Sequence, residues 1–488
     1  MRSIRCVLVV LLACAGPPRT EADEASDLLA EARRAEAAGD LAGALERFGR
    51  VLEEWPESEA AISVAVRGAD FVRRARYARV AGGRDIVAVA DDLSVLEGLV
   101  GRYLTSSEID VDLARQILRT DGVTPALLEA IARWAPIHPA ASPGIVRREV
   151  VDAEGGRRGA YFVAVPDSYD PGARWPVLVY LHGTDGTEEI ARASATSLAR
   201  AFPGHLVVAP AADRLVGWGP NPHGLSRIES TIETVRREFA IDPDRIAITG
   251  YSMGGHGTWD YAIRHPSVPS AILPQAGTKL DTLKKGLLEN LVGLPIRFLH
   301  GEADGLAPVS FAREMDAALQ GAGVEHAYRE FAGVGHLGFP QAEVSDALRW
   351  VAAARRPRLA RRTWAYREPG RTLCDWIRVD QVGKVETFRL NYKDLAGAPL
   401  VEVEGYYEPV VVRARIEEGQ VILEGERAKK VTILLHPSMV DLQKAVVVKS
   451  GGRVLFSRKV AADPGLVLES LRRDAGRPYR ASVTVTLR

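Results

Sequence analysis

Gly250-Tyr251-Ser252-Met253-Gly254 is the stretch of sequence that decides the fold of the central part of the chain. It follows the apolar run Ile246–Thr249 and leads into the amphipathic stretch Gly254–Arg264, so it predicts a tight turn from a strand into a helix. In a G-x-S-x-G turn the glycines avoid clashes that a Cβ would make, and the serine hydroxyl is held above the end of the strand. The alternative is an incidental glycine-rich turn. The strand and the helix on either side favour Ser252 as a nucleophile.

A serine hydroxyl is a poor nucleophile at neutral pH, so the chain must also supply a base and an acid that orients the base. Asp304 follows the apolar run Ile296–Leu299, and His336 follows the next apolar run, beside glycines. The order Ser252, Asp304, His336, each at the carboxyl end of a strand, is the order expected after such a turn. Of the ten histidines, His336 alone combines that order with that end of a strand. Glu302 is the rival acid, and it lies nearer to the strand.

Charge that develops on a substrate carbonyl oxygen needs two backbone N–H donors, which together form an oxyanion hole. We predict that Met253 supplies one donor and Thr184, in the loop after the apolar run Val177–Leu181, supplies the other. Trp218 and His223 lie in a Gly- and Pro-rich loop and either shape an acyl or alcohol pocket or pack under that loop. The sequence has no Walker A, His-Glu-x-x-His or Cys-x-x-Cys motif, so it predicts no metal and no cofactor.

Several of these segments occur together in one family. From about Arg158 to Arg355, the sequence resembles the α/β-hydrolase esterases of the polyhydroxybutyrate-depolymerase and feruloyl-esterase type, which are esterase D-like and related to prolyl oligopeptidases. The resemblance covers about 200 of 488 residues. It is carried by the P-x-x-Y-x-P stretch Pro166–Pro171, Trp175-Pro176, Leu181-His182-Gly183, the turn and helix Gly250–Trp259, His300-Gly-x-x-Asp304 and Gly-x-Gly-His336.

The resemblance implies an α/β-hydrolase fold and a serine mechanism through Ser252, His336 and Asp304. It implies a serine carboxylesterase that cleaves acyl esters linked to polysaccharides or in polyesters. The substrate itself stays open, because members of the family cleave polysaccharide esters, polyesters, thioesters or peptides. Two alternatives remain: a serine peptidase of prolyl-oligopeptidase type, and a non-catalytic envelope scaffold whose helical region binds a partner protein.

The composition is that of an ordinary folded chain. The 488 residues are 47% hydrophobic and 26% charged, which excludes a disordered or fibrous chain and a protein with many membrane spans. The 63 basic and 63 acidic side chains balance, so no general attraction for nucleic acid or an anionic membrane is expected. At roughly 150 residues for each domain, this length predicts about three domains.

The pattern of residues changes along the chain at the expected domain boundaries. Residues 21–136 are rich in Ala, Leu, Glu and Arg and predict helices, and Gly39–Pro56 matches the second half of a tetratricopeptide repeat (TPR). A proline-containing linker is expected over 137–157. Apolar runs that alternate with helical stretches over 158–356 predict a mostly parallel sheet with helices on both faces, which is the α/β catalytic domain. Alternating strands over 361–488 predict a β-sandwich.

Residues 1–15 read as a secretory signal, with a short basic start and an apolar run from Cys6 to Ala15. Ala13-Cys14-Ala15 fits a cleavage site, and Leu11-Leu12-Ala13-Cys14 also resembles a lipobox that would lipidate Cys14. A buried first strand is the remaining interpretation. We therefore expect an exported protein, periplasmic or extracellular, whose contact with a membrane would come only from lipidated Cys14. The expected partners are an ester substrate, polymeric in one interpretation, and a protein bound by the helical region.

Overall fold

The computed structural model of the chain describes residues 20–81, 93–151, 157–184, 186–212, 217–218, 222–278, 286–356, 361–393, 399–473 and 477–487. The predicted signal at 1–15 lies outside these residues. The chain divides into two compact units, Met1–Val100 with Arg115–Ala135, and Gly101–Ala114 with Pro136–Arg488. Among the described residues, no helix combines the length and the apolar composition needed to span a bilayer.

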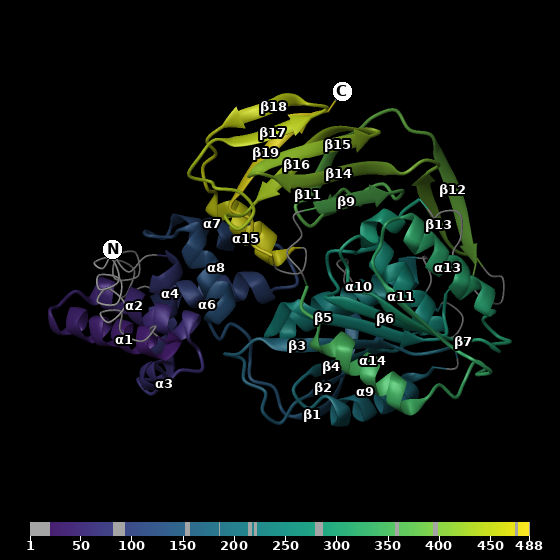
Figure 1. The fold of residues 1–488 in the computed structure, drawn as a ribbon, viewed down its shortest axis with the longest axis horizontal. Coiled ribbons are helices and arrows are strands. Elements are labelled where there is room, and N and C mark those ends of the chain that lie inside the picture. The colour runs from purple at the N-terminus through teal and green to yellow at the C-terminus, as the bar shows by residue number, and fades with distance from the viewer. Residues whose placement is uncertain are drawn as a thin grey trace, which may run out of the picture. The chain divides into compact units, whose positions relative to one another are not determined.

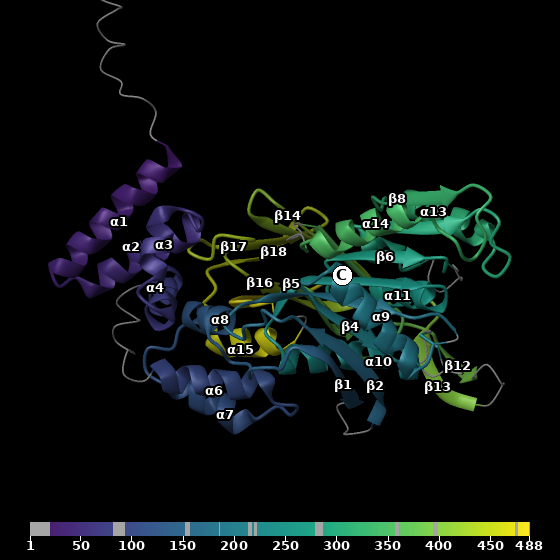
Figure 2. The same cartoon turned by 90° about the horizontal axis from the view of Figure 1, so that it is seen from below.

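The described part of 21–134 is helical, as the composition predicts. Four of its helices begin at capping residues: the side chains of Thr20, Asp40, Ser58 and Thr124 each accept a hydrogen bond from an N–H in the first turn. Small residues allow close packing, since a Cβ on Gly49 would lie 2.1 Å from the Ala75 carbonyl oxygen. Helices α1, α2 and α4 lie side by side (Figures 1 and 2). The helices are α1 Glu21–Ala37, α2 Leu41–Glu54, α3 Glu59–Ala65, α4 Ala69–Ala81, α6 Leu93–Thr105, α7 Val111–Arg119 and α8 Pro125–Trp134.

An eight-stranded sheet forms the centre of the second unit, in the order β1-β2-β4-β3-β5-β6-β7-β8. Strands β3 to β8 run parallel, whereas β2 is antiparallel to both of its neighbours, β1 and β4. The central strands are continuous apolar runs because both of their faces are buried. The strands are β1 Gly144–Val151, β2 Arg157–Val165, β3 Trp175–Leu181, β4 Leu206–Pro210, β5 Ile241–Tyr251, β6 Ala271–Gln275, β7 Arg297–Gly301 and β8 Ala327–Phe331.

Helices cover both faces of this sheet, as predicted. Successive side chains of a strand point to opposite faces, so Val177 and Val179 of β3 pack in the core under one set of helices and Leu178 in the core under the other. Figure 1 shows α10, α11 and α13 on one side of the sheet and α9 and α14 on the other. These helices are α9 Glu188–Ala201, α10 Pro222–Glu238, α11 Met253–Arg264, α13 Val309–Gly321 and α14 Gln341–Ala353, with the short 3-10 helix η1 Leu288–Leu291.

The predicted linker at 137–157 is wrong in its second half, where β1 adds an edge strand to the sheet. Residues of β1 pair with β2 from Gly144 opposite Val165 onwards. Arg147 and Arg148 of β1 form ion pairs with Glu188 and Glu238. An edge strand carries such charged side chains without cost, so its sequence lacks the apolar run that marks a buried strand.

The C-terminal part of the chain is mostly strands, arranged in sheets of four, five and two strands. Side chains of the four- and five-stranded sheets share one apolar core, which includes Trp364 and Trp376. Two-stranded β12–β13 stands apart from both sheets (Figures 1 and 2). The helix α15 was not predicted. The elements are β9 Arg361–Tyr366, β10 Leu373–Cys374, β11 Ile377–Val382, β12 Thr387–Lys393, β13 Pro399–Tyr406, β14 Val410–Glu417, β15 Gln420–Glu426, β16 Ala428–Leu435, β17 Val446–Ser450, β18 Arg453–Arg458, α15 Pro464–Arg472 and β19 Ala481–Thr486.

Candidate active site

The turn between β5 and α11 has the geometry that its glycines predict. Ser252 has φ 56° and ψ −117°, a strained conformation for a residue with a Cβ. A Cβ on Gly250 would lie 2.3 Å from the Gly254 carbonyl oxygen, and a Cβ on Gly254 would lie 1.9 Å from the Leu181 carbonyl oxygen. The Ser252 N–H donates to the Gln275 carbonyl at the end of β6, 2.8 Å away. The sheet thus holds the serine in this conformation.

The structure brings Ser252, His336 and Asp304 together at the carboxyl ends of their strands. His336 Nε2 lies 2.9 Å from Ser252 Oγ, and His336 Nδ1 lies 2.7 Å from Asp304 Oδ2. An ionised carboxylate only accepts hydrogen bonds, so it fixes the proton of the imidazole on Nδ1. Nε2 then has a free lone pair directed at the serine hydroxyl. This is the arrangement that a serine nucleophile requires.

The surroundings of Asp304 keep its carboxylate ionised. Its side chain is fully buried, and Oδ1 accepts the N–H groups of Leu306 and Ala307 at 2.9 and 2.8 Å. Burial alone would raise the pKa of Asp304, but the N–H of Ala307, the imidazole of His336 and the N–H of Leu306 outweigh it and lower that pKa. His300 contacts the same loop, because its Nε2 lies 2.8 Å from the Ala307 carbonyl oxygen.

The rival acid Glu302 has another partner. It is exposed, and its Oε2 accepts the N–H of Gly333 at 2.9 Å. The histidine ring is hydrogen-bonded to Asp304 instead. Between the two possible acids, the structure therefore places Asp304 in the orienting position.

Gly301 sits where the Asp304 loop and the His336 loop approach most closely. A Cβ at this position would lie 2.3 and 2.4 Å from the carbonyl oxygens of Gly335 and Val334. These are backbone atoms just before His336, so Gly301→Ala is expected to displace the imidazole and lower kcat for a small ester about 10- to 100-fold. The measurement is kcat and KM, with the larger change in kcat.

The control for this prediction is Gly321→Ala at the end of α13, where a Cβ meets no atom within 4 Å. It should leave kcat unchanged. If both alanine variants behave like the wild type, the His336 loop does not depend on the close approach at Gly301.

Tyr251, to which no sequence pattern assigns a role, also contacts the His336 loop. Its hydroxyl donates to the His336 carbonyl, and its ring centroid lies 5.6 Å from that of the imidazole. Burial, together with the charge of Asp304 and the proximity of Tyr180, raises the pKa of Tyr251 to about 12. The hydroxyl therefore keeps its proton, and its role as a donor, at neutral pH.

The predicted oxyanion donors lie beside the nucleophile. A Cβ on Gly183 would be 3.6 Å from Ser252 Cβ, so the loop after β3 borders the serine. Thr184 is the next residue of that loop, and Met253 is the first residue of α11. The N–H of Met253 therefore lies at the positive end of the helix. Both positions suit the predicted donors.

Trp218 packs in the apolar core of the central domain. It is 1% exposed, and its indole N–H donates to the His182 carbonyl at 2.9 Å. His182 is buried as well: its Nε2 accepts the N–H of Ala212 at 2.9 Å, and its Nδ1 lies 2.7 Å from the Gly183 carbonyl oxygen. His223 falls in α10, but its side chain lies outside the described residues.

His182 and His300 share a sequence signal, since each stands in a Leu-His-Gly stretch at the end of a strand. Each buried imidazole is hydrogen-bonded to the backbone of the loop that follows. The repeated stretch therefore marks loops that are held beside the catalytic groups. The two identical Leu-His-Gly stretches are the signal in the sequence from which this role could be inferred.

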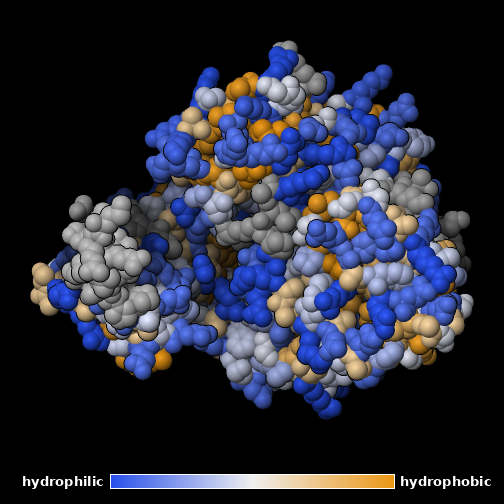
Figure 3. Space-filling model, in the orientation of Figure 1, coloured by the Kyte–Doolittle hydropathy of each residue, from blue (hydrophilic) through white to orange (hydrophobic). Residues whose placement is uncertain are grey.

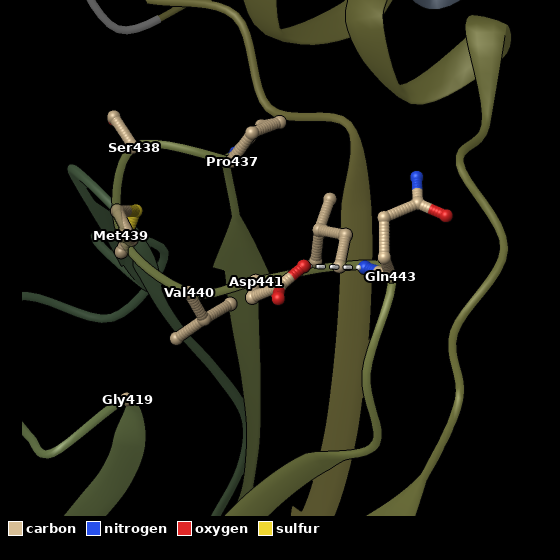
Figure 4. Close-up of a pocket in the computed structure, with 8 residues that line it drawn as sticks. Gly419, Pro437, Ser438, Met439, Val440, Asp441 and Gln443 are labelled. Carbon is tan, nitrogen blue, oxygen red and sulfur yellow. Dashed lines mark hydrogen bonds between the residues drawn. The ribbon is translucent and has the colours of Figure 1, made fainter.

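A hollow of the C-terminal part offers no comparable chemistry. It is lined by Gly419, between β14 and β15, and by residues 437–443, in the connection from β16 to β17 (Figure 4). Its one carboxylate, Asp441, accepts the N–H of Gln443 at 2.9 Å and so stabilises the turn. Within the described part of the chain, no group of three or more His, Cys, Asp or Glu side chains is placed to hold a metal ion.

Residues 161–362 match the model of the Dienelactone hydrolase family. No curated protein matches the chain. The chain is similar to a thermostable esterase, with 26% identity over 43% of this chain and 63% of that one and a TM-score of 0.37, so it spans less than two thirds of that esterase. It is also similar to a ferulic acid esterase, with 19% identity over 42% and 94% of the two chains and a TM-score of 0.34. An S-formylglutathione hydrolase from Agrobacterium tumefaciens shows 17% identity over 44% and 97%, with a TM-score of 0.36.

The family match and the strand order give the same result for the central domain. It has an α/β-hydrolase fold, with the antiparallel second strand and the serine turn after β5. The match to a hydrolase family supports a serine hydrolase of the esterase type.

Proposed function

We propose that this protein is a serine carboxylesterase that cleaves acyl esters linked to polysaccharides or in polyesters, as esterases of the polyhydroxybutyrate-depolymerase and feruloyl-esterase type do. The observation that carries the proposal is the chain of hydrogen bonds from Asp304 through His336 to Ser252, at 2.7 and 2.9 Å. Ser252 lies in the strained turn after β5, where its hydroxyl is within hydrogen-bond distance of His336.

In the proposed mechanism, Ser252 Oγ attacks the acyl carbon while His336 Nε2 takes the hydroxyl proton. The negative charge on the carbonyl oxygen is stabilised by the N–H groups of Met253 and Thr184. His336 then gives the proton to the leaving alcohol, and an acyl-enzyme remains. A water molecule, deprotonated by His336, attacks the acyl carbon. The bond to Ser252 Oγ then breaks, His336 returns the proton to that oxygen, and the acid leaves. Asp304 stabilises the imidazolium in both halves of the reaction.

The test is labelling with a fluorophosphonate probe followed by a panel of esters. The probe is expected to modify one residue, which peptide mass spectrometry should locate at Ser252. The ester panel holds acetyl, butyryl, feruloyl and 3-hydroxybutyrate esters, and peptide amides form a second arm. Hydrolysis of esters at rates far above those of amides supports the proposal. Faster amide hydrolysis would favour a peptidase, and absence of labelling would favour a non-catalytic scaffold.

We further propose that the protein is exported, by virtue of residues 1–15, and that the alternative of a lipidated Cys14 would tether it to a membrane. The helical region would then bind a protein partner through its TPR-like helices. The four- and five-stranded sheets would form a β-sandwich, for which their common apolar core is the support. Metabolic labelling with a lipid precursor, in cells that express wild-type protein or Cys14→Ser, tests the anchor.

A further inference from the structure

Two exposed leucines stand directly beside the catalytic groups. Among the described residues, three large apolar side chains are more than 70% exposed: Val66 at 78%, Leu306 at 79% and Leu337 at 72%. Leu306 lies two residues after Asp304, and Leu337 follows His336. The face of the molecule drawn in Figure 3 is mostly hydrophilic. Single exposed apolar residues are ordinary, but two of the three most exposed ones adjoin two catalytic residues, Asp304 and His336.

Hydrogen bonds hold the backbone at Leu306 and directly before Leu337. The N–H of Leu306 donates to Asp304 Oδ1 at 2.9 Å. Leu337 comes after a residue whose ring is hydrogen-bonded to Asp304 and Ser252, and whose carbonyl accepts the Tyr251 hydroxyl. The two side chains are therefore exposed on loops whose backbones are held by hydrogen bonds. An apolar group that covered them would gain from leaving water.

A further apolar side chain, Phe339, follows two residues after Leu337. Phe339 is half-buried, and its ring centroid lies 5.9 Å from that of Tyr251 and 5.2 Å from that of Phe331. On the other loop, exposed Glu302 lies two residues before Asp304. A carboxylate at that place disfavours an anionic group nearby. This side of the site thus suits an uncharged, apolar group.

The proposed mechanism decides which part of the ester would occupy this side. His336 Nε2 must reach the oxygen of the leaving alcohol to protonate it, so the alcohol lies toward the His336 loop. The carbonyl oxygen must point toward Met253 and Thr184, in other loops of the site. The leucines flank the histidine and its acid, and therefore lie on the alcohol side.

We infer that Leu306 and Leu337 are specificity-determining residues that bind an apolar alcohol group of the ester, an alkyl or aryl group. This inference rests on the proposed function. It predicts a preference that depends on the alcohol and not on the acyl group.

The test uses Leu306→Ser, Leu337→Ser and the double variant with three uncharged esters. Hexyl acetate and methyl acetate differ in the alcohol, and methyl hexanoate and methyl acetate differ in the acyl group. Each single change is expected to lower kcat/KM for hexyl acetate about fivefold, and both together roughly 20-fold. The value of kcat/KM for methyl acetate should fall by a smaller factor than that for hexyl acetate, and the ratio of methyl hexanoate to methyl acetate should stay constant.

The matched control is Val454→Ser on β18, where a 56% exposed aliphatic side chain lies outside the catalytic domain. It should not change kcat/KM for any of the three esters. Equal losses on all esters, a loss that follows the acyl group, or no loss at all would each overturn the inference. Failure of the proposed function is a different result, because the wild type would then hydrolyse none of these esters and would not react with a fluorophosphonate.

Discussion

Replacing Ser252 by alanine is expected to lower kcat/KM for p-nitrophenyl acetate by about 10⁴- to 10⁶-fold, as removal of a serine nucleophile does in other hydrolases. The hydroxyl forms the covalent bond to the acyl group, and no other hydroxyl is hydrogen-bonded to His336 Nε2 in the described structure. The fold should persist, because alanine at φ 56° is strained to the same degree as the serine. The measurements are kcat/KM, fluorophosphonate labelling and the melting temperature.

The control for this variant is Ser197→Ala, an exposed serine on α9. It should keep full activity and full labelling. If Ser252→Ala retained a tenth or more of the wild-type activity while folded, then another nucleophile would act and the proposed mechanism would be wrong. If Ser197→Ala lost activity as well, the assay would be reporting stability and not the loss of a nucleophile.

The central domain could be predicted from the sequence because its strands are buried on both faces. Such strands leave apolar runs, and a parallel sheet brings the residues that follow them to one edge. That reasoning selects Ser252, Asp304 and His336 as neighbours although they are far apart in the chain. The glycines of the turn could be interpreted for the same reason: they lie where backbone segments meet, at Gly250 and Gly254.

Elements at the edges and choices between neighbouring residues could not be predicted in this way. The strand β1 carries charges, so nothing in its pattern separates it from a linker. Asp304 and Glu302 both follow a strand, and what separates them is the pair of N–H groups from Leu306 and Ala307. Trp218 fits either a pocket or a core by composition, and the His182 carbonyl that accepts its N–H decides between them. These are contacts made by loop backbones, which leave no periodic pattern in a sequence.

One further network that no sequence pattern announced joins the start of β5 to the C-terminal sheets. Asp375, between β10 and β11, is 1% exposed and accepts hydrogen bonds from Arg362, Arg477 and the Tyr479 hydroxyl. Arg477 and Arg356 also form ion pairs with Asp244, in the first half of β5. Asp375, Arg356 and Arg362 are buried, and Asp244 and Arg477 are partly buried, so each charge depends on its partners for compensation.

Asp375→Asn is expected to destabilise the protein by about 3–5 kcal/mol, because the change leaves Arg362 buried with an uncompensated charge. The melting temperature should fall by about 10 °C. Burial would raise the pKa of Asp375, but Arg477, Arg362, Arg356 and the Tyr479 hydroxyl lower it well below its ordinary value. The stabilisation is therefore complete above the unfolded-state pKa of about 4 and is lost as the pH falls further toward the folded-state value.

The pH dependence separates this electrostatic role from simple packing. The difference in melting temperature between wild type and Asp375→Asn should be constant between pH 6 and 8, where the carboxylate is ionised in both states, and should shrink below about pH 4. Asp346→Asn is the matched control, since Asp346 is 70% exposed in its ion pair with Arg349, and it should shift the melting temperature by less than about 1 °C. A loss in Asp375→Asn that is the same at pH 3 and pH 7 would assign the effect to packing. A loss no larger than that of Asp346→Asn would mean that Arg362 and Arg477 find compensation without Asp375.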